Sequence, residues 1–449
     1  MTNRRDFLRR AAVASAATAA TLALPAAAVS APSREMLALA RDRAGTPLPA
    51  PPQGALELVA QDEAYWREIA AQYAITDQTT NLEAGYWGMM SAPVLAAYHR
   101  NVDRVNRENS YFARREFPAL SQMARTRTAN ALGVSAGEIA FARNATEALQ
   151  AMIGQYNRLQ AGDVVMYADL DYPAMQMAMN ALAAKRGASV ATLDIPEPAT
   201  REHILAAYTR ALDAHPRTRL LLLTYPSNKT GLMPPVRELV ALAKARGVDT
   251  VLDAAHAFGQ VPLSLEEIGA PFAGVNLHKW IGSPIGVAAL YIHRDALDRI
   301  DRAHGDDGPL ERIDSRIHTG TTDFAAVMTV PDALDFQERI GIPRKAARLR
   351  YLRDLWVSPA RAIAGVDILV PDEAGLAGAI TSFRLRGDGS RAGNAGVART
   401  LLDEFGIFTV ARSGLAKGDC VRVTPALYST PADAAKLVAA LRVMAARGA

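Results

Sequence analysis

Nearly continuous apolar runs of strand length alternate with helix-like segments from about residue 56 to residue 350. The strand candidates are 164–167, 220–225, 250–253 and 287–292. The helix candidates are 146–159, 174–186, 203–215 and 236–246. Strands without polar alternation are typical of a parallel sheet with helices on both faces. The pattern therefore predicts an α/β domain built on a mainly parallel sheet.

The pattern changes near residue 336. A basic, helix-like connector at 339–361 is followed by shorter elements of both kinds. These are strand candidates 380–385 and 421–424 and helix candidates 396–405 and 432 onwards. Strands and helices that do not alternate in βαβ fashion favour a smaller α+β domain at the C-terminus.

The first 31 residues have the composition of an export signal. Arginines precede an Ala-rich apolar run at 11–24, and small residues follow it as a possible cleavage site. Arg4-Arg5 followed by Phe7 and Leu8 resembles a twin-arginine signal. That resemblance implies passage through the twin-arginine export machinery and a periplasmic location. An uncleaved anchor is the alternative, but a run made mostly of Ala is a poor permanent span, so we expect no stable membrane insertion after cleavage.

These boundaries predict five segments. They are a signal peptide at 1–31, a Pro-rich linker at 32–55, an N-terminal arm joining the small domain at 56–95, a large domain at 96–335 and a small domain at 336–449.

Composition narrows the class of protein. Half of the 449 residues are hydrophobic, which supports a large core and excludes global disorder. The formal net charge is +4, and four arginines against one aspartate in residues 1–31 supply +3 of it, so no nucleic-acid partner is expected. The single cysteine, Cys420, excludes a disulfide framework and any Cys-rich metal site. The histidines lack metal-binding spacing, so no metal site is predicted.

Four short segments carry candidate chemistry. Asn144 can cap a helix, with Glu147 three residues later, and the free N–H groups of such a helix start bind phosphate well. Residues 225–231 form a turn after a Leu-rich strand. Taken alone, the first segment is better explained as an ordinary capped helix, and the second as an ordinary turn.

The other two segments place ionisable groups at buried positions. Asp253 ends an apolar strand, where open α/β sheets present ligand-binding groups, and His256 follows it. Lys279 lies between apolar residues and glycines, and burial would lower its pKa and leave more neutral amine for a Schiff base. A helix-capping Asp with a packed His, and a surface Lys, are the alternatives.

Together and in this order, the segments resemble the class V branch of fold-type-I pyridoxal-phosphate (PLP) enzymes, from about residue 81 to the C-terminus. The matching motifs are Asn144-Ala145-Thr146, Ser227-Asn228-x-x-Gly231, Asp253-x-x-His256 and His278-Lys279. The first and third look most like isopenicillin-N-epimerase-like proteins. The resemblance implies PLP as cofactor and a fold-type-I PLP transferase, with a large parallel-sheet domain and a smaller α+β domain.

The resemblance also implies roles around the cofactor. Lys279 would bind PLP as a Schiff base and then act as general acid and base at the substrate α-carbon. Asp253 would pair with the protonated ring nitrogen. The remaining expected cofactor contacts are Ala145, Thr146 and His278 at the phosphate, Asn228 and His256 near the ring hydroxyl, and Tyr172 stacked on the ring. A core position is the alternative for Tyr172.

Further positions would contact the substrate or a second subunit. Arg422 matches the family's arginine for the substrate α-carboxylate, a task that suits the guanidinium fork. Tyr86 and Trp87 resemble the segment that borders the substrate pocket; core aromatics at a turn are the alternative. Thr321 matches a segment that reaches the phosphate of the neighbouring subunit, which implies a homodimer.

The expected activity is class V aminotransferase-type chemistry on a small-molecule substrate, an amino acid or amino-bearing peptide, with epimerisation or racemisation as the main alternative. Cysteine desulfurases carry a nucleophilic Cys on the loop that here spans 411–418, and this loop has none. Desulfuration or lyase chemistry is therefore less favoured, as is a binding protein without catalysis. Cys420 lies two residues before Arg422 at the edge of this strand candidate, and alternate side chains of a strand share a face, which leaves open whether its thiol lines the pocket.

Overall fold

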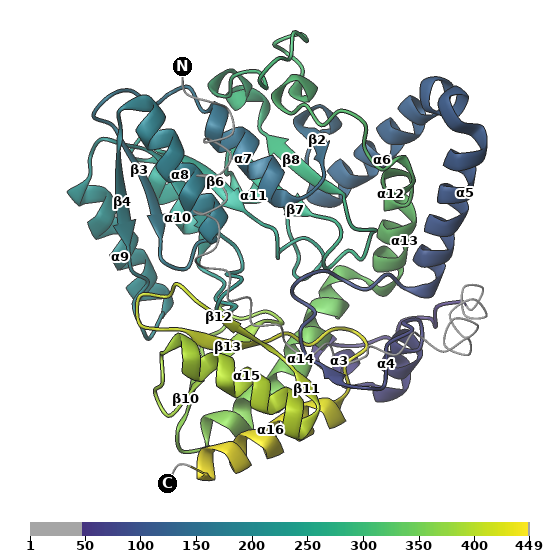
Figure 1. The fold of residues 1–449 in the computed structure, drawn as a ribbon, viewed down its shortest axis with the longest axis vertical. Coiled ribbons are helices and arrows are strands. Elements are labelled where there is room, and N and C mark those ends of the chain that lie inside the picture. The colour runs from purple at the N-terminus through teal and green to yellow at the C-terminus, as the bar shows by residue number, and fades with distance from the viewer. Residues whose placement is uncertain (1–46, 448–449) are drawn as a thin grey trace, which may run out of the picture.

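The computed structural model describes residues 47–447 and shows a large part and a smaller part that meet along one boundary (Figure 1). The predicted signal peptide and most of the predicted linker lie outside the described residues. Within 47–55, no helix or strand forms. No helix in the described range combines the length and apolar character that crossing a membrane requires.

The large part is built on a seven-stranded sheet with the order β2-β8-β7-β6-β5-β3-β4. The strands are β2 (Ile139–Ala142), β3 (Val164–Ala168), β4 (Ser189–Leu193), β5 (Thr218–Thr224), β6 (Asp249–Asp253), β7 (Phe272–Asn276) and β8 (Ala288–Ile292). Strands β3 to β7 pair in parallel, and only β8 runs antiparallel to its two neighbours. The predicted mainly parallel sheet is confirmed.

Helices cover both faces of this sheet, and alternate side chains of one strand reach opposite cores. Leu220 and Leu222 of β5 pack into the core beneath α7 (Ala145–Gln155) and α8 (Pro173–Arg186). Leu221 and Leu223 pack into the other core. Its helices include α6 (Phe117–Leu132), α9 (Arg201–Ala214), α10 (Val236–Lys244) and α13 (Val330–Ile340). Burial on both faces explains why the strands lack polar alternation.

One predicted boundary was wrong. The helix expected over 146–159 ends at Gln155, because Tyr156 adopts extended backbone (φ −60°, ψ 123°) and pairs with Ile300. Local periodicity could not reveal this pairing, since Ile300 lies far along the chain.

The small part is an antiparallel sheet with the order β12-β13-β10-β9, packed against helices. Its elements are α14 (Ile342–Arg361), β9 (Val366–Ile368), β10 (Thr381–Leu385), α15 (Arg391–Phe405), β11 (Ile407–Phe408), β12 (Val410–Arg412), β13 (Cys420–Val423) and α16 (Pro431–Ala446). This arrangement gives the predicted α+β architecture.

The N-terminal segment lies against the small part. Strand β1 (Thr80–Asn81) pairs in parallel with β11, and Glu83 continues this pairing with Thr424. Buried Arg348 of α14 forms an ion pair with Glu63 of α4. The remaining described elements are α3 (Leu56–Ala60), α4 (Glu63–Ala70), α5 (Ala92–Arg115), η1 (Ala136–Glu138), α11 (Leu265–Ile268), η2 (Arg294–Arg299), η3 (Ile313–Arg316) and α12 (Phe324–Met328).

Candidate active site

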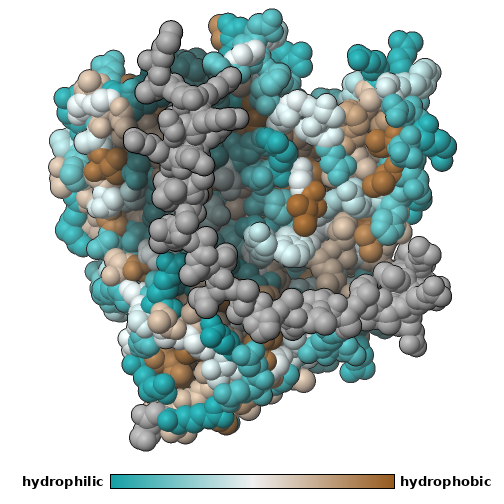
Figure 2. Space-filling view, viewed as in Figure 1, coloured by the Kyte–Doolittle hydropathy of each residue, from teal (hydrophilic) through white to brown (hydrophobic). Residues whose placement is uncertain are grey.

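A cavity of about 470 Å³ lies where β5, β6 and β7 end at their carboxyl termini. The large part supplies most of the residues predicted for the site: Ala145, Thr146, Tyr172, Asn228, Asp253, His256, His278 and Lys279 all line it. Tyr86 and Arg422 line it from the N-terminal segment and the small part. The surface is hollowed toward its middle on the face shown in Figure 2. The carboxyl edge of the sheet is where this architecture is expected to hold ligands.

Lys279 lies just beyond β7 with its backbone held in place. The N–H of Gly88 donates to the carbonyl of His278 (2.8 Å), and a Cβ at Gly88 would lie 1.7 Å from the carbonyl oxygen of Lys279. Position 88 therefore requires glycine. Burial lowers the pKa of Lys279 to about 7, Asp253 opposes that shift, and Arg422 adds to it. A substantial fraction of the amine is thus neutral near neutral pH, as Schiff-base formation requires.

His256 connects Lys279 to Trp280 by a pair of contacts that fixes its tautomer. The indole Nε1–H of Trp280 can only donate, and it lies 3.3 Å from Nδ1 of His256. The proton of the neutral imidazole is therefore on Nε2, which lies 3.0 Å from Nζ of Lys279. Burial also lowers the pKa of His256 well below its usual value. His256 thus donates to Lys279, and the amine accepts in its uncharged form.

Asp253 is a buried carboxylate with little compensation from the protein. It is 4% exposed, and Oδ1 accepts from the N–H of Ala255 at 3.1 Å. Among residues 47–447, no Lys, Arg or His lies within ion-pair distance of it, and burial raises its pKa. A buried acid at a cavity wall suits a protonated ring nitrogen, which would supply the missing positive charge.

The start of α7 forms a second polar wall. Asn144 caps the helix by accepting from the N–H of Glu147 at 2.9 Å. The N–H of Ala145 donates to Oδ1 of Asn276 (2.8 Å) and is thus used within the protein. That N–H is therefore not available to a phosphate, and Thr146, in the first turn of α7 at the cavity wall, stays the predicted phosphate contact. The positive end of the helix dipole favours an anion here.

His278 is kept neutral. Its Nδ1 lies 3.2 Å from the carbonyl of Val287, so this nitrogen carries the proton and donates. Burial lowers the pKa of His278 to about 4. Any contact that it makes with a phosphate is thus made by an uncharged ring.

Two further cavity residues fit a bound ring. Oδ1 of Asn228 is buried without a hydrogen-bond partner, so a polar group of a ligand would satisfy it. Tyr172 stands at the N-cap of α8 and is 38% exposed, which contradicts the core alternative. Together with Asp253, Lys279 and the start of α7, these features fit PLP. Asp253 offers a partner for a protonated ring nitrogen, and Lys279 offers an amine for the aldehyde. The start of α7 offers an anion site for the phosphate, and Asn228 a polar partner for the ring.

Arg422 is almost fully buried, and its guanidinium already has partners within the protein, so it is more than an open binding group for a substrate carboxylate. Its side chain is 1% exposed; Nη1 donates to the carbonyl of Asn228 at 2.8 Å, and Nη2 forms an ion pair with Glu83. Arg412 also contacts Glu83, at 3.4 Å, and its side chain is 28% exposed. Sequence reasoning named Arg422 and missed this carboxylate and the second arginine. The only local signal was the position of Arg412 shortly before the strand that carries Arg422; the structure places it at the end of β12.

Thr321 does not line the cavity. It is exposed on the segment between η3 and α12, so a role at the phosphate of this same chain is not what the structure shows. The expected contact with a neighbouring subunit stays a prediction.

The question left open for Cys420 is answered by its burial. The thiol is fully buried, does not line the cavity, and lies 3.7 Å from the carbonyl of Lys229. Burial raises its pKa to about 11. The preceding loop is held down as well, because Lys229 donates to Gly414 (2.9 Å) and Asp169 accepts from the N–H of Ala416 (2.9 Å).

The fold and the site define an enzyme that holds an aldehyde cofactor on a lysine at the carboxyl edge of a parallel sheet. A family model described as aminotransferase class-V matches residues 92–434. The isopenicillin N epimerase of Amycolatopsis lactamdurans is 30% identical over 396 residues, which cover 84% of this chain and 98% of that protein. The chain belongs to the class V aminotransferase family, and it is PLP-dependent.

Solved structures agree with the fold. The apo cysteine desulfurase from Thermococcus onnurineus NA1 has a TM-score of 0.74 at 18% identity, covering 85% of this chain and 98% of that chain. A C-DES mutant with glycine covalently linked to its PLP cofactor has a TM-score of 0.71 at 21% identity, covering 83% and 98%. The predicted fold-type-I architecture is confirmed.

Proposed function

We propose that this protein is an exported enzyme that acts at the α-carbon of an amino acid or amino-bearing peptide, with transamination as its reaction. The observation that carries the proposal is that the contact between Lys279 and His256 shares one cavity with the buried Asp253, which has no ion-pair partner among the described residues and whose pKa burial raises. A neutral amine and a buried acid are the two groups that lysine-bound PLP chemistry requires of the protein.

The bound cofactor supplies an electron sink for a bond at the α-carbon. Asp253 keeps the ring nitrogen protonated by its negative charge. Lys279, once its amine is free, would take a proton from the α-carbon and, in transamination, deliver it to the cofactor carbon that carries the aldehyde. His256 orients that amine through Nε2. Arg412 and Arg422 give the substrate end of the cavity positive charge, partly balanced by Glu83, and so favour a carboxylate.

Epimerisation is the second candidate, supported by the 30% identity to an isopenicillin N epimerase. It differs from transamination only in where the proton returns. Desulfuration has less support, because Cys420 is buried, has a raised pKa and lies outside the cavity.

The test is to incubate PLP-loaded enzyme with a panel of L- and D-amino acids and short peptides in deuterated water. Transamination predicts a 2-oxo product and one equivalent of aminated cofactor, measured by chromatography after denaturation. Epimerisation predicts the opposite enantiomer with deuterium at the α-carbon and unchanged cofactor. Neither product with any member of a broad panel, in unreduced enzyme from a preparation in which borohydride treatment of a separate sample fixes the cofactor to Lys279, would overturn catalysis at the α-carbon for these substrates.

Export and assembly are parts of the proposal with separate tests. Replacing Arg4-Arg5 by two lysines should retain the protein in the cytoplasm, as measured by cell fractionation, whereas the wild type should reach the periplasm. Sedimentation of the wild type should give the mass of a homodimer, the assembly in which Thr321 would reach a neighbouring cavity. A monomer with full activity would contradict that role for Thr321.

A further inference from the structure

Lys345 is a buried lysine that lies close to Lys279 and has no part in the chemistry proposed above. It stands on α14 and is 3% exposed, and its Nζ donates to the carbonyl of Trp280 and to Oε1 of Gln337, the latter at 2.8 Å. Burying an amine costs free energy, and an apolar side chain of the same length would fill the space without that cost. The contacts of the amine therefore explain a lysine at this position.

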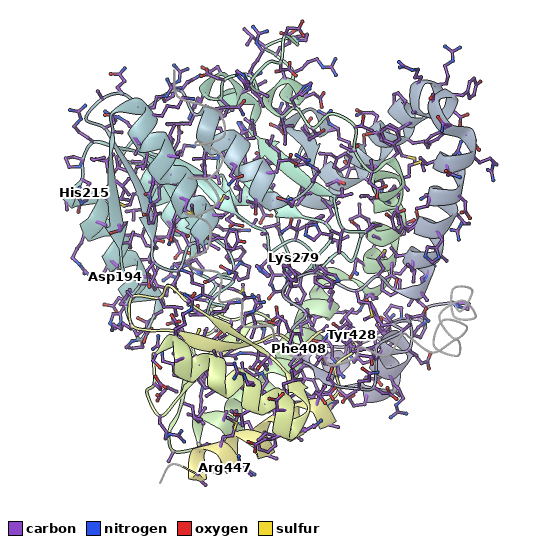
Figure 3. The ribbon with its side chains drawn as sticks, in the orientation of Figure 1. Asp194, His215, Lys279, Phe408, Tyr428 and Arg447 are labelled. Atoms are coloured by element: carbon purple, nitrogen blue, oxygen red, sulfur yellow. The ribbon has the colours of Figure 1, made fainter. Side chains whose placement is uncertain are left out.

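The small cavity that Lys345 lines is too confined for Lys345 to serve as a second cofactor lysine. Its volume is about 30 Å³, and Lys279, Trp280 and Gln337 are among its other walls. Figure 3 shows Lys279 near the boundary between the two parts, above Tyr428, which also lines this small cavity. A space of this size holds about one water molecule and admits neither an amino acid nor PLP. Lys345 therefore acts on groups of the protein itself.

Side chains of two helices hold consecutive carbonyls of the segment that carries Lys279. From α14, Lys345 donates to the carbonyl of Trp280, and from α13, Nε2 of Gln337 donates to the carbonyl of Ile281 at 3.0 Å. Because the amine of Lys345 also donates to Oε1 of Gln337, the amide is turned so that Nε2 faces Ile281. The backbone directly after Lys279 is thus anchored at two adjacent residues.

The donors of Lys345 match the acceptors around it. A neutral amine has two N–H groups, and the described residues offer Nζ two acceptors. Burial lowers the pKa of Lys345, which also favours the neutral form. The other ionisable walls of its cavity are Tyr73, Tyr428 and Lys279, and burial raises the pKa of both tyrosines, so none of them supplies negative charge near neutral pH.

We propose that Lys345 is a positioning residue for Lys279 and acts through Trp280. It holds the backbone of Trp280, whose indole Nε1 lies 3.3 Å from Nδ1 of His256, and Nε2 of His256 lies 3.0 Å from Nζ of Lys279. The backbone position of Trp280 decides where its indole reaches, so loss of the amine of Lys345 lets the indole leave His256. The inference rests on the proposed function only in that Lys279 binds the cofactor.

The first test variant is Lys345→Met, which keeps a side chain of similar length but has no donor. Without the indole to fix its tautomer, His256 can accept at Nε2 from the charged amine of Lys279 and stabilise it. PLP capture by the apoenzyme requires the neutral amine, so the pH midpoint of the capture rate should move up by about one unit, the shift that one hydrogen bond produces. Stopped-flow absorbance across the neutral pH range measures this midpoint.

A double variant separates the proposed route from a simple effect of charge. Removing a charged Lys345 would also raise the midpoint, but that effect would not pass through the indole. Adding Lys345→Met to Trp280→Phe should therefore move the midpoint no further than Trp280→Phe alone. A shift that persists undiminished in the Trp280→Phe background would overturn the proposal, and so would an unshifted midpoint in Lys345→Met.

Lys229→Met is the matched control. Lys229 is 1% exposed and donates to two backbone carbonyls, those of Asp169 and Gly414, but it lines neither of the two cavities that Lys279 lines. Its loss should lower the free energy of unfolding, as the loss of Lys345 does, yet leave the midpoint in place. An equal shift in both variants would overturn the proposal, because any buried lysine would then have the same effect.

Gln337→Met is the second test variant and decides the question if Lys345→Met does not fold. It removes one acceptor of Lys345 and the contact with Ile281 but keeps the contact with Trp280, so the midpoint should move in the same direction by a smaller amount. An unshifted midpoint in this variant would overturn the proposal. The expected shifts, together with no product from the amino-acid panel, would leave the positioning role standing and overturn the proposed function.

Discussion

The two ends of strand β6 carry the same side chain in opposite environments. At the amino end, Asp249 accepts from the hydroxyl of Tyr156 (2.8 Å) and pairs with Arg299 at 2.5 Å. At the carboxyl end, Asp253 accepts from the N–H of Ala255 and forms no ion pair among the described residues, although Lys279 is near enough to act on its pKa. The protein supplies Asp249 with a positive charge and a hydroxyl donor, whereas the charge of Asp253 is left for a ligand to balance.

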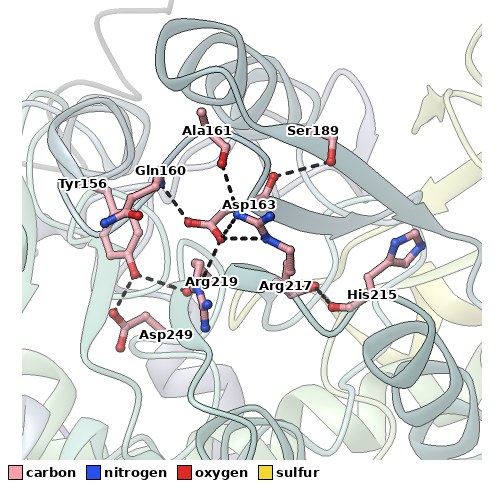
Figure 4. A network of polar contacts seen from close by, with 10 residues as sticks. Tyr156, Gln160, Ala161, Asp163, Ser189, His215, Arg217, Arg219 and Asp249 are labelled. Carbon is pink, nitrogen blue, oxygen red and sulfur yellow. Dashed lines mark hydrogen bonds and ion pairs between the residues drawn. The ribbon is translucent and has the colours of Figure 1, made fainter.

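A second buried carboxylate at the amino edge of the sheet, Asp163, also has several partners within the protein. Asp163 accepts from the N–H of Gln160 at 2.9 Å and from Arg217 at 3.3 Å, with Arg219 at 3.5 Å (Figure 4). A buried carboxylate with several partners stabilises the fold, whereas one without partners lowers stability until a ligand binds. The difference indicates which edge is structural and which is functional.

The largest expected effect comes from removing the amine. Lys279→Ala should abolish borohydride-stable attachment of PLP and lower turnover by about 10⁴-fold or more, because the covalent bond and the proton carrier are lost together. Peptide mass mapping after borohydride treatment measures the attachment.

A second buried lysine sharpens this test within the wild type. Burial lowers the pKa of Lys345 to about 7 as well, but its Nζ already donates to Oε1 of Gln337 (2.8 Å) and to the carbonyl of Trp280. Labelling should therefore occur at Lys279 and not at Lys345. Equal labelling of both would mean that burial alone, and not position at the cavity, selects the lysine.

Substitutions of the two aspartates of β6 should have opposite effects on turnover and on stability. Asp253→Asn should lower turnover by about 10²-fold or more, because an amide cannot keep the ring nitrogen protonated, and it should not lower the free energy of unfolding of the apoprotein. Asp249→Asn should do the reverse: it breaks an ion pair and costs about 1–3 kcal/mol in unfolding free energy, with cofactor binding retained. Denaturant titration and cofactor absorbance measure the two quantities.

The comparison fails if Asp253→Asn destabilises the apoprotein as much as Asp249→Asn does. Asp253 would then be a structural carboxylate like its counterpart. The direction of its raised pKa already predicts otherwise, since burial disfavours its charged form in the free protein.

The sequence predicted the residues at the carboxyl edge of the sheet better than the contacts at the amino edge. Motif order placed Asp253, His256 and Lys279 correctly around one cavity, because strand ends in a parallel sheet share an edge. The partners of Asp249 could not be predicted, since Tyr156 and Arg299 are distant in the chain and belong to no motif. Glu83 was missed for the same reason: it lies beside Arg422 because the N-terminal segment pairs with the small part, where Glu83 is the bridge partner of Thr424.

Truncating Arg422 should have a smaller effect, divided between binding and folding. Arg422→Ala should raise KM by about 10- to 100-fold for substrates with a free α-carboxylate. It should also lower stability by about 3 kcal/mol, because Glu83 is then buried without its closest partner. Adding Glu83→Gln to Arg422→Ala should recover stability without restoring KM. If the double variant regains the wild-type KM, Arg422 serves only to neutralise Glu83.

The smallest expected effect concerns the proton on Lys279. In Trp280→Phe, Nδ1 of His256 loses the indole donor that fixes the tautomer. The ring proton can then move to Nδ1, and Nε2 can accept a hydrogen bond from the charged amine of Lys279 and stabilise it. The pKa of Lys279 should rise from about 7 by about one unit, since such a shift corresponds to one hydrogen bond of about 1.4 kcal/mol. PLP capture by the apoenzyme requires neutral amine, so its rate rises with pH through this pKa, and the midpoint of the rise should move to higher pH.

Stopped-flow absorbance across pH 5–9, a range of about two units either side of neutrality that brackets a lysine pKa lowered by burial, measures that midpoint. Trp356→Phe is the control, because Trp356 is also buried but packs in the core of the small part against Phe383. It should leave the midpoint in place even if it costs stability. An unshifted midpoint in Trp280→Phe would show that burial alone keeps the amine neutral. The hydrogen-bonded chain from Trp280 would then be part of the packing, like the carboxylates at the opposite edge of the sheet.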